Sequence, residues 1–433
     1  MSARLPAALR AYRALSSAAA ALAPMVLAQR VKRGKEQRER LPERHGIARV
    51  ARPNGPLIWL HGASVGELLA VLPLIERLRA RGMNLLVTSG TVTSGELAGQ
   101  RLPRGVIHQF VPLDVPRYVR RFLDHWRPDL VLLVEADLWP NMIVETSARS
   151  VPLILINARV SERSFRRWNY LRSAIVDLLR RFDLCLAGTL ADAERLTALG
   201  APRVETAGNL KLDVPAPPAD DKNLMQLKDA IALRPLIAAA STHPGEESAV
   251  IAAHQRLRGN FPGLLTIIAP RHPERGPAVV ELAAAAGLKA ALRSRGERLD
   301  AATEIYVADT VGELGLLYRL APVVFIGGSL IKHGGQNPIE AAKLGAAILH
   351  GPNVANFAEI YEALDTAHGA EVVVDANRLT AAFGAWLSDG AARKRAADAA
   401  KQTVDSLGGA LDRTLQSLEP YLMQLQLRGR THA

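Results

Sequence analysis

The sequence is poor in cysteine and in aromatic residues. Its 433 residues include one cysteine, Cys185, and only 5% are Phe, Trp or Tyr. A single cysteine excludes a disulfide framework and any zinc site made only of cysteine thiolates. Cys185 lies in an apolar run, which favours a small buried side chain over a nucleophile. A reducing compartment is the simplest setting for such a chain.

Several common ligand-binding patterns are also missing. The sequence has no zinc-finger spacing and no aromatic-plus-basic RNA-binding signature. His243 and His272 are not at metal-ligand spacing with other donors, so we expect no metal and no cofactor. Segment 62–67 contains two glycines but lacks the Gly-Lys-Ser/Thr ending of a P-loop. Hydrophobic content of 48% with 22% charged residues excludes a disordered chain, and the length predicts two or three domains.

Positive charge is concentrated at the N-terminus. The net charge is +12, and residues 1–49 hold eleven Arg or Lys against three Glu, a net +8. The rest of the chain is therefore close to balanced. A balanced body disfavours a broad nucleic-acid-binding surface, so we expect no nucleic-acid partner.

An uncharged run, residues 14–29, lies within this basic segment. It is shorter than the ~20 residues of a spanning helix, and Pro24 interrupts it. The basic block that follows disfavours a secretory signal. The two remaining interpretations are a plain surface helix and an anchor whose apolar side chains enter the membrane surface while residues 30–44 meet anionic headgroups. The anchor interpretation predicts that the first 30 residues take no part in folding, so a chain starting near Ile47 should be more soluble.

Beyond residue 50, short apolar runs alternate with longer segments of helical period, which is typical of a parallel sheet covered on both faces. A proline-rich acidic stretch, 213–221, interrupts the pattern and is interpreted as an interdomain linker. We therefore expect an α/β fold of two Rossmann-like domains facing a cleft. The expected strands are 57–60, 85–88, 130–134, 153–156 and 184–187, then 236–240, 264–269, 305–307, 323–326, 347–349 and 372–374.

Candidate site residues in the first half follow the expected strands. Glu67 stands in the first turn of a helix after the strand at 57–60. Its position alone favours an acid that complements the helix dipole over a general base at the cleft. Glu135 and Asp137 follow the strand at 130–134 and are either a polar site or caps for the next helix. Lys211 comes just before the linker, although a surface lysine is the default for any single Lys.

The second half contains a stronger pattern. Arg271 follows the strand at 264–269, where a guanidinium suits phosphate. Glycines at 327–328 precede Asn337 and Pro338, which predict an N-cap, a helix start and an anion site at the helix N-terminus. Glu340, one turn in, is placed to accept hydrogen bonds from a ribose diol. The same letters also fit an ordinary capped helix.

Seven motifs occur in order along the chain and together resemble one family. They are Gly-Ala-Ser-Val-Gly-Glu at 62–67, Glu-Ala-Asp-Leu-Trp-Pro-Asn at 135–141, Asn-Ala-Arg-Val-Ser at 157–161, Ser-Thr-His-Pro-Gly-Glu-Glu at 241–247, Pro-Arg-His-Pro-Glu-Arg at 270–275, Gly-Glu-Leu-Gly-Leu-Leu-Tyr at 312–318, and Gly-Gly-Ser at 327–329 with Asn-Pro-Ile-Glu at 337–340. The chain resembles the 3-deoxy-D-manno-octulosonic acid (Kdo) transferases, the lipid A glycosyltransferases, over essentially its whole length.

The resemblance implies a GT-B fold and transfer of Kdo from CMP-Kdo to a lipid A precursor (lipid IVA-type) in lipopolysaccharide core biosynthesis. It implies inversion at the anomeric carbon without a metal, at the cytoplasmic side of the inner membrane, with an anionic membrane surface as a partner. The implied organisation is an N-terminal membrane-anchor segment at 1–48, an acceptor domain at 49–212, the linker at 213–221, a CMP-Kdo domain at 222–405 and C-terminal helices at 406–433.

The resemblance also implies residue roles. Glu67 matches the family's catalytic base, which reverses the preference from position alone, and Glu135 and Lys211 match residues that steady the transition state. The sequence departs from the family's pattern at Gln336, where many relatives have His, and at Asp137, where many have Glu. The segment Ser-Gly-Thr-Val-Thr-Ser at 89–94 is a loose version of the family's threonine-rich loop. The CMP-binding segments correspond to Pro270, Arg271, Val311, Gly312, Glu313, Asn337, Pro338, Ile339 and Glu340.

Two other functions remain open on the residues alone. One is a different GT-B enzyme, either a UDP-sugar glycosyltransferase or a nucleotide-sugar epimerase. The other is a non-enzymatic α/β body tethered by its basic N-terminus. The sequence does not indicate the number of Kdo residues transferred, the acylation preference or the oligomeric state.

Overall fold

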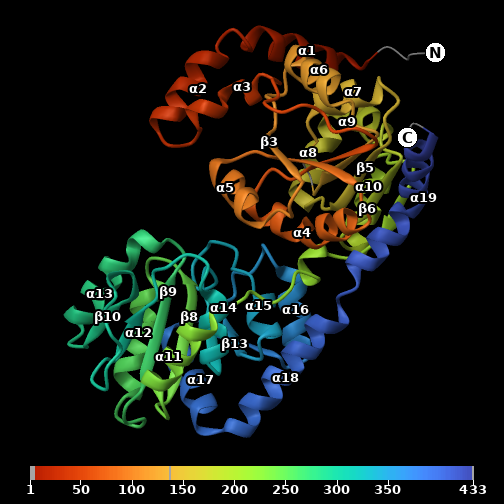
Figure 1. Cartoon of the computed structure of the whole chain (residues 1–433). Coiled ribbons are helices and arrows are strands. Elements are labelled where there is room, and N and C mark those ends of the chain that lie inside the picture. The colour runs from red at the N-terminus through yellow and green to blue at the C-terminus, as the bar shows by residue number, and fades with distance from the viewer. Residues whose placement is uncertain (1–4, 136–137, 432–433) are drawn as a thin grey trace. The chain divides into compact units, whose positions relative to one another are not determined.

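The computed structural model describes residues 5–135 and 138–431, with side chains described as far as residue 427. The chain forms two compact units (Figure 1). Unit 1 contains the chain up to Val214 and again from Gly408, and unit 2 runs from Pro215 to Leu407. Each unit is built on one parallel sheet, which confirms the expected α/β class.

In the described residues, unit 1 holds a seven-stranded parallel sheet in the order β3-β2-β1-β4-β5-β6-β7. The strands are β1 (Leu57–His61), β2 (Asn84–Ser89), β3 (Ile107–Phe110), β4 (Leu130–Val134), β5 (Leu153–Ala158), β6 (Leu184–Ala187) and β7 (Val204–Thr206). The helices are α1 (Ala7–Ala19), α2 (Ala23–Lys32), η1 (Arg38–Arg40), α3 (Leu41–Arg44), α4 (Val65–Ala80), α5 (Val92–Arg101), α6 (Pro116–Trp126), α7 (Pro140–Ser147), α8 (Glu162–Tyr170), α9 (Arg172–Leu179), α10 (Leu190–Ala198), η2 (Leu210–Leu212) and α19 (Ala410–Thr431).

Unit 2 holds a second seven-stranded parallel sheet in its described residues, in the order β10-β11-β9-β8-β12-β13-β14. The strands are β8 (Leu236–Thr242), β9 (Leu265–Pro270), β10 (Ala290–Leu292), β11 (Ile305–Val307), β12 (Val323–Ile326), β13 (Ala347–His350) and β14 (Ala370–Val372). The helices are α11 (Asp221–Ile231), α12 (Glu246–Leu257), η3 (Pro273–Arg275), α13 (Gly276–Ala285), η4 (Arg293–Arg295), α14 (Leu314–Leu320), α15 (Ile339–Lys343), α16 (Ala358–Thr366), α17 (Ala376–Ser388) and α18 (Gly390–Ser406).

The interior strands match the expected positions, whereas the edge strands do not. None of the expected strands corresponds to β3, β7 or β10, and β14 begins two residues before the strand expected at 372–374. All four are edge strands. An interior strand of a parallel sheet is buried on both faces and therefore reads as a continuous apolar run. Edge strands such as Val204–Thr206 are short and partly exposed, so they carry no such run.

The N-terminal segment is part of unit 1, contrary to the expectation that the first 30 residues stand outside the fold. Leu9 is 3% exposed and belongs to the core cluster that contains Trp59 and Phe122. Helix α1 packs against α6, α7 and α9. Tyr12 donates a hydrogen bond to Asp114 at 2.9 Å, and Arg13 forms an ion pair with Glu145 at 2.6 Å. A chain that starts near Ile47 would lose these contacts.

Part of the N-terminal charge is also structural. Arg44 is 4% exposed, and its guanidinium donates to the carbonyl oxygens of Gly90 at 2.7 Å and Val111 at 3.1 Å. The Glu36 carboxylate accepts from Arg44 and from Arg30, each at 3.0 Å. A buried charge is stable only when it is paired and hydrogen-bonded, as it is here. These basic residues therefore hold the segment to the sheet rather than serving only as a charged surface.

In the described part of the chain, no single helix is long and apolar enough to cross a membrane. Helices α1 and α2 together meet the length and composition test, but they are bent by 66° at the break between them. The bend follows from Pro24, which occupies the first turn of α2 and cannot continue the hydrogen bonding of α1.

The C-terminal helix α19 completes unit 1, as the blue ribbon in Figure 1 shows. Leu415, Leu418 and Leu422 are buried in the same core cluster as Ile58. Asp213 fixes the point of return, because its carboxylate accepts the backbone N–H groups of residues 409 and 411 at 2.7 and 2.5 Å. Unit 1 therefore includes the expected anchor segment and C-terminal helices as well as the region expected to be the first domain.

The integration of α1 can be tested by a matched pair of alanine substitutions. Leu9→Ala should lower the free energy of unfolding by about 2–5 kcal/mol, the usual cost of removing a buried leucine side chain. Leu15→Ala, on the same helix but 70% exposed, should change it by less than about 0.5 kcal/mol. Urea unfolding followed by tryptophan fluorescence measures both. Equal, small effects would mean that α1 is not part of the folded unit.

Candidate active-site residues

Glu67 lies in the first turn of helix α4, which follows β1. Ser64 is the N-cap, and its hydroxyl oxygen accepts the Glu67 backbone N–H at 3.3 Å. In return, the Glu67 carboxylate accepts the Ala63 N–H and the Ser64 hydroxyl, each at 2.7 Å. This is a variant of the capping box, so the helix-capping role expected from position is present. The same contacts hold the half-buried carboxylate in one orientation at the carboxyl end of β1.

Glu135 and Lys211 are brought together although they are far apart in the sequence of unit 1. Their side chains form an ion pair, with the Lys211 Nζ atom 2.6 Å from Glu135 Oε1 and both side chains largely buried. Glu135 follows β4 directly and has a φ of +58°, a left-handed conformation that is strained for a residue with a side chain. Asp137, which the sequence analysis paired with Glu135, lies outside the described residues.

Asn157, which the sequence analysis assigned no role, positions Lys211. It is the next-to-last residue of β5, and its Oδ1 atom accepts the Leu210 backbone N–H at 2.9 Å. The bond fixes the short helix η2, which carries Lys211 and packs against α4. An Asn at a strand end inside the motif at 157–161 was the available signal, because its side chain accepts hydrogen bonds in turns and tolerates a positive φ.

Glu67, Glu135 and Lys211 therefore lie at the carboxyl edge of the unit 1 sheet, where its parallel strands end. β1 and β4 are adjacent and parallel, with His61 opposite Leu133, so Glu67 and Glu135 both follow the carboxyl ends of neighbouring strands. Lys211 reaches the same edge through its contact with Glu135. Ligands of open parallel sheets bind at this edge. The arrangement offers a carboxylate to accept a proton and an ammonium to stabilise negative charge.

In unit 2, Arg271 stands at the carboxyl end of β9. Its backbone N–H donates to the Thr242 carbonyl at 2.9 Å, and its side chain is exposed. The ring of His243, at the end of β8, lies 4.2 Å from that of His333 and 5.9 Å from that of His272. Burial, followed by the charge of these neighbours, lowers the pKa of His243 to about 4. His243 is therefore neutral at pH 7 beside a cationic Arg271.

Glu246 organises the glycine loop after β12 and was missed by the sequence analysis as a structural residue. It is 1% exposed, and its carboxylate accepts four backbone N–H groups at 2.7–3.0 Å, from residues 243, 328, 329 and 330. Glu247 is fully buried and pairs with Arg275 at 3.1 Å. The signal was a pair of acids directly after a glycine at a strand end, which is unusual on a buried helix turn.

The segment at 337–340 differs in detail from the expected helix start. Helix α15 begins at Ile339 rather than at Pro338, although the Asn337 Oδ1 atom does accept the Ile339 N–H at 3.0 Å. The helix has five residues, so the expected anion site at a strong helix dipole is not supported. Glu340 lies within reach of Asn337, at 3.4 Å, and burial raises the pKa of its carboxyl.

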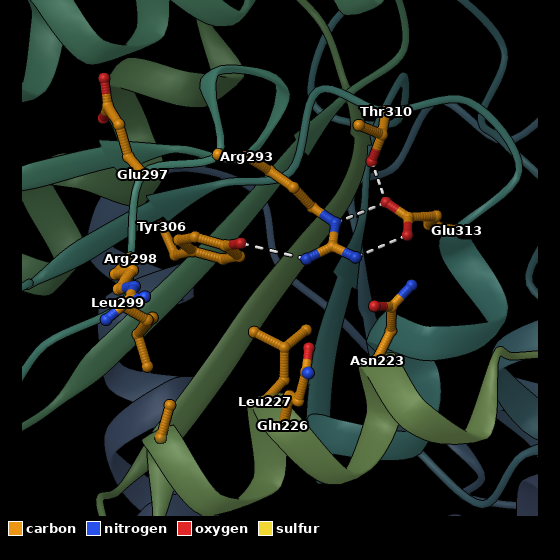
Figure 2. A pocket seen from close by; sticks show the side chains of 12 residues that line it. Asn223, Gln226, Leu227, Arg293, Glu297, Arg298, Leu299, Tyr306, Thr310 and Glu313 are labelled. Atoms are coloured by element: carbon orange, nitrogen blue, oxygen red, sulfur yellow. Dashed lines mark hydrogen bonds and ion pairs between the residues drawn. The ribbon is translucent and has the colours of Figure 1, made fainter.

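Residues 311–313 are the third segment that the resemblance implies for CMP binding. Of these, Glu313 lines a cavity of about 670 Å³ (Figure 2). Val311 is 87% exposed, and Gly312 has a φ of +85°. Glu313 does not extend into solvent: its carboxylate forms a bidentate ion pair with Arg293 and accepts a hydrogen bond from the Thr310 hydroxyl. The Arg293 guanidinium also donates to the Tyr306 hydroxyl at 3.1 Å. The contact with Arg293 keeps the pKa of Glu313 below its ordinary value.

The chain is similar to known proteins along most of its length. Residues 39–214 match the family described as 3-Deoxy-D-manno-octulosonic-acid transferase (kdotransferase). The chain is 36% identical over 381 residues to a probable 3-deoxy-D-manno-octulosonic acid transferase, mitochondrial, of Arabidopsis thaliana, covering 86% of this chain and 85% of the relative. It is 34% identical over 397 residues to the 3-deoxy-D-manno-octulosonic acid transferase of Haemophilus influenzae, covering 89% and 92%.

A solved structure resembles the fold. The crystal structure of a putative UDP-N-acetylglucosamine 2-epimerase from Listeria monocytogenes matches with a TM-score of 0.61 and 15% identity, covering 86% of this chain and 97% of that one. At this identity the likeness concerns the fold alone.

Glu246 gives a prediction for unit 2. Glu246→Gln replaces one acceptor oxygen by an NH₂ group that faces backbone N–H donors, so the free energy of unfolding should fall by on the order of 3 kcal/mol. Glu281→Gln, an exposed acid on α13, serves as the control and should have an effect below about 0.5 kcal/mol. Guanidinium unfolding measures both. A stable Glu246→Gln variant would contradict the anchoring role.

Proposed function

The chain belongs to the family of 3-deoxy-D-manno-octulosonic acid (Kdo) transferases, and from this premise we propose that it transfers Kdo from CMP-Kdo to a lipid A precursor. The observation that carries the proposal is the sequence match to family members across both units, at 34% identity over 89% of the chain. The ordered motifs already pointed to this family. The finer assignments below, including a GT-B type of fold and inversion at the anomeric carbon, are part of the proposal.

In unit 1, Glu67 is proposed to be the general base. An inverting transfer needs a group that takes the proton of the acceptor hydroxyl as the oxygen attacks the anomeric carbon. Contacts with Ala63 and Ser64 hold the Glu67 carboxylate in a fixed orientation, which supports this role because proton transfer requires a positioned base. Its capping role and its catalytic role are compatible, since a carboxylate has about four acceptor positions.

Lys211 and Glu135 are proposed to steady the transition state. The bond to CMP breaks with negative charge developing on the phosphate, and an ammonium stabilises that charge in a site of low dielectric. The 2.6 Å contact with Glu135 and the Asn157 bond to η2 support a fixed position for Lys211. A preorganised charge needs no rearrangement during the reaction, which is the source of its effect.

Unit 2 is proposed to hold the donor. Arg271 is suited to the CMP phosphate because a guanidinium donates to two phosphate oxygens at once. Pro270 ends the strand that presents it, and 337–340 supplies Asn337 and Glu340 for the nucleoside. For Val311, Gly312 and Glu313 we assign contact through the backbone, since the Glu313 carboxylate is engaged by Arg293.

We further propose that the protein acts at the cytoplasmic side of the inner membrane, on an anionic surface. Exposed basic side chains lie at the end of helix α2 and just after it, at Lys32, Arg33, Lys35 and Arg38. The exposed apolar side chains of Leu15, Leu22 and Met25 lie on or between helices α1 and α2. Apolar side chains next to basic ones are the combination that binds an anionic membrane surface. In this proposal, the N-terminal helices are both part of unit 1 and its membrane contact.

The reaction itself can be tested directly. Incubation of the full chain with CMP-Kdo and a tetraacylated lipid A precursor should yield the precursor with one or more added Kdo units, together with CMP. Mass spectrometry of the lipid product measures both transfer and the number of units. Absence of any transferred sugar, with folded protein and intact donor, would contradict the proposal.

Glu67 can be tested with a control for its cap. Glu67→Gln should slow transfer by on the order of 10²–10⁴-fold, since it removes the proton acceptor and keeps the shape. Ser64→Ala removes the N-cap hydroxyl and one of the two contacts that hold the carboxylate, but it keeps the carboxylate itself, so it should cost about 1 kcal/mol of stability and slow transfer far less than Glu67→Gln. Transfer rate and melting temperature are measured on both. If the two variants lose activity to the same small extent, Glu67 is a cap and not the base.

The donor assignment predicts a nucleotide preference. Calorimetry should show that CMP binds and that UDP binds more weakly, whereas the reverse would favour a UDP-sugar enzyme of the same fold.

Arg271→Ala should weaken CMP binding by about 1.5–3 kcal/mol, the scale of a hydrogen bond to a charged group. Arg395→Ala, an exposed charge on α18, is the control. Equal CMP affinity in both variants would remove Arg271 from the donor site.

A further inference from the structure

Unit 1 contains an apolar pocket that the catalytic assignments do not use. It has a volume of about 540 Å³ and lies among α1, α2 and the loops that follow β1, β2, β3 and β4. Ala20, Ala23 and Leu27 form the helical wall, and Val111 and Met142 lie on the side of the sheet. The volume falls within the range of small-molecule and cofactor sites in proteins.

The charged side chains on the pocket wall have ion-pair or hydrogen-bond partners within the protein. Glu36 accepts from both Arg30 and Arg44 at 3.0 Å. Asp114 accepts from the Tyr12 hydroxyl at 2.9 Å and from two backbone N–H groups, of residues 141 and 142, at 3.0 and 2.9 Å. A pocket whose polar atoms already have partners offers a ligand little besides apolar contact, so its best occupant is a hydrocarbon.

His61 completes this apolar character. It is fully buried on the pocket wall, its Nδ1 atom lies 2.9 Å from the Thr88 hydroxyl, and burial lowers its pKa to about 4. The imidazole is therefore neutral at pH 7 and adds no charge to the cavity.

The pocket adjoins the proposed base. Ala63 lies on the pocket wall, and its backbone N–H is the group that holds the Glu67 carboxylate at 2.7 Å. Gly90, also on the wall, donates its N–H to the Ala63 carbonyl at 2.9 Å, and a Cβ atom at Gly90 would lie 2.9 Å from that oxygen. A molecule in the pocket is thus separated from Glu67 by a single residue.

The mouth of the pocket is exposed and apolar. Leu22, Val26 and Trp139 line the pocket and are 58%, 51% and 42% exposed. The exposed basic residues begin at Lys32, which is the last residue of α2 and lies six positions after Val26. An apolar mouth next to cationic side chains fits a lipid that carries both an alkyl chain and an anionic headgroup.

We propose that this pocket takes one acyl chain of the lipid acceptor and thereby positions the acceptor sugar at Glu67. The inference rests on the proposed function, because the acceptor of that reaction is an anionic acylated lipid. It gives the bent α1–α2 pair a specific role: the bend closes one side of a chain-binding pocket as well as contacting the membrane surface. The pocket then selects acceptors by their acyl chains.

A direct binding experiment uses Trp139 as the reporter. A dibrominated fatty acid, kept below its micelle concentration, should quench tryptophan fluorescence of the full chain, and Trp139→Phe should remove most of that quenching. The lipid A precursor should reverse the quenching by competition. If there is no quenching, or if the precursor does not displace the fatty acid, an acceptor chain does not occupy the pocket. The second result would indicate general lipid binding and would equally overturn the proposal.

A matched pair of variants links the pocket to turnover. Val26→Asp places a carboxylate at the mouth, whereas Gln29→Asp adds the same charge to the same helix at an exposed residue that does not line the pocket. The measured quantity is the ratio of kcat/KM for the acylated acceptor to that for the same acceptor with its acyl chains removed. This ratio should fall about tenfold or more in Val26→Asp and stay near the wild-type value in Gln29→Asp.

These outcomes separate the pocket from the proposed function. If the wild-type chain transfers no Kdo to either acceptor, the proposed function fails, and the fluorescence experiment still reports on the pocket. If the wild-type chain transfers Kdo and both variants keep its ratio, the proposed function stands and the acyl-chain pocket is wrong. An equal fall in both variants would indicate a membrane charge effect and would also overturn the pocket assignment.

Discussion

All described strand pairs within each sheet are parallel. This constraint determines where the polar side chains of the candidate sites lie. Interior strands such as β1 and β4 are buried along their whole length, so their backbone bonds and apolar side chains leave no place for functional groups. The carboxyl ends of the strands share one edge of each sheet, and the segments that follow them carry Glu67 and Glu135 in unit 1 and Arg271 in unit 2.

At these edges, some residues have strained backbone conformations, and buried polar side chains hold the neighbouring loops through hydrogen bonds. Glu135, Asn157 and Ser241 adopt positive φ values at or near strand ends, and at Asn157 and Ser241 the strand pairing shifts register before it resumes. Asn157 then fixes the helix that carries Lys211, and Glu246 fixes the glycine loop after β12 with four hydrogen bonds. Each anchor restricts a loop that would otherwise be mobile. Preorganised loops are what electrostatic stabilisation of a transition state requires.

The sequence predicted the interior of both sheets and the placement of the candidate residues Glu67, Glu135 and Arg271 just after strands, because both leave local signals. A fully buried strand is a continuous apolar run, and Glu67 stands in a recognisable helix start. The edge strands left no such signal. The roles of Asn157 and Glu246 depend on partners that are distant in sequence, at 210 and at 328–330, so local patterns did not reveal them.

The N-terminal segment shows the limit of arguments from charge and composition. Its basic residues predicted a separate membrane anchor, yet Arg13 forms an ion pair with Glu145, and Arg44 donates to the carbonyl oxygens of Gly90 and Val111. Its apolar residues divide between two uses: Leu9 and Leu27 are buried, whereas Leu15 and Met25 are exposed. Composition does not separate these uses, because only the packing partners do.

The central claim is that the contact between Lys211 and Glu135 is part of the reaction machinery at the carboxyl edge of unit 1. A double-mutant cycle on the transfer rate tests it most directly, with Lys211→Met, Glu135→Gln and the double variant compared with wild type. Groups that act as one unit give strongly non-additive effects. The account predicts that each single variant transfers Kdo at least about 100-fold more slowly and that the double variant is no slower than the slower single one. Near-normal transfer by Lys211→Met, or effects that multiply in the double variant, would contradict it.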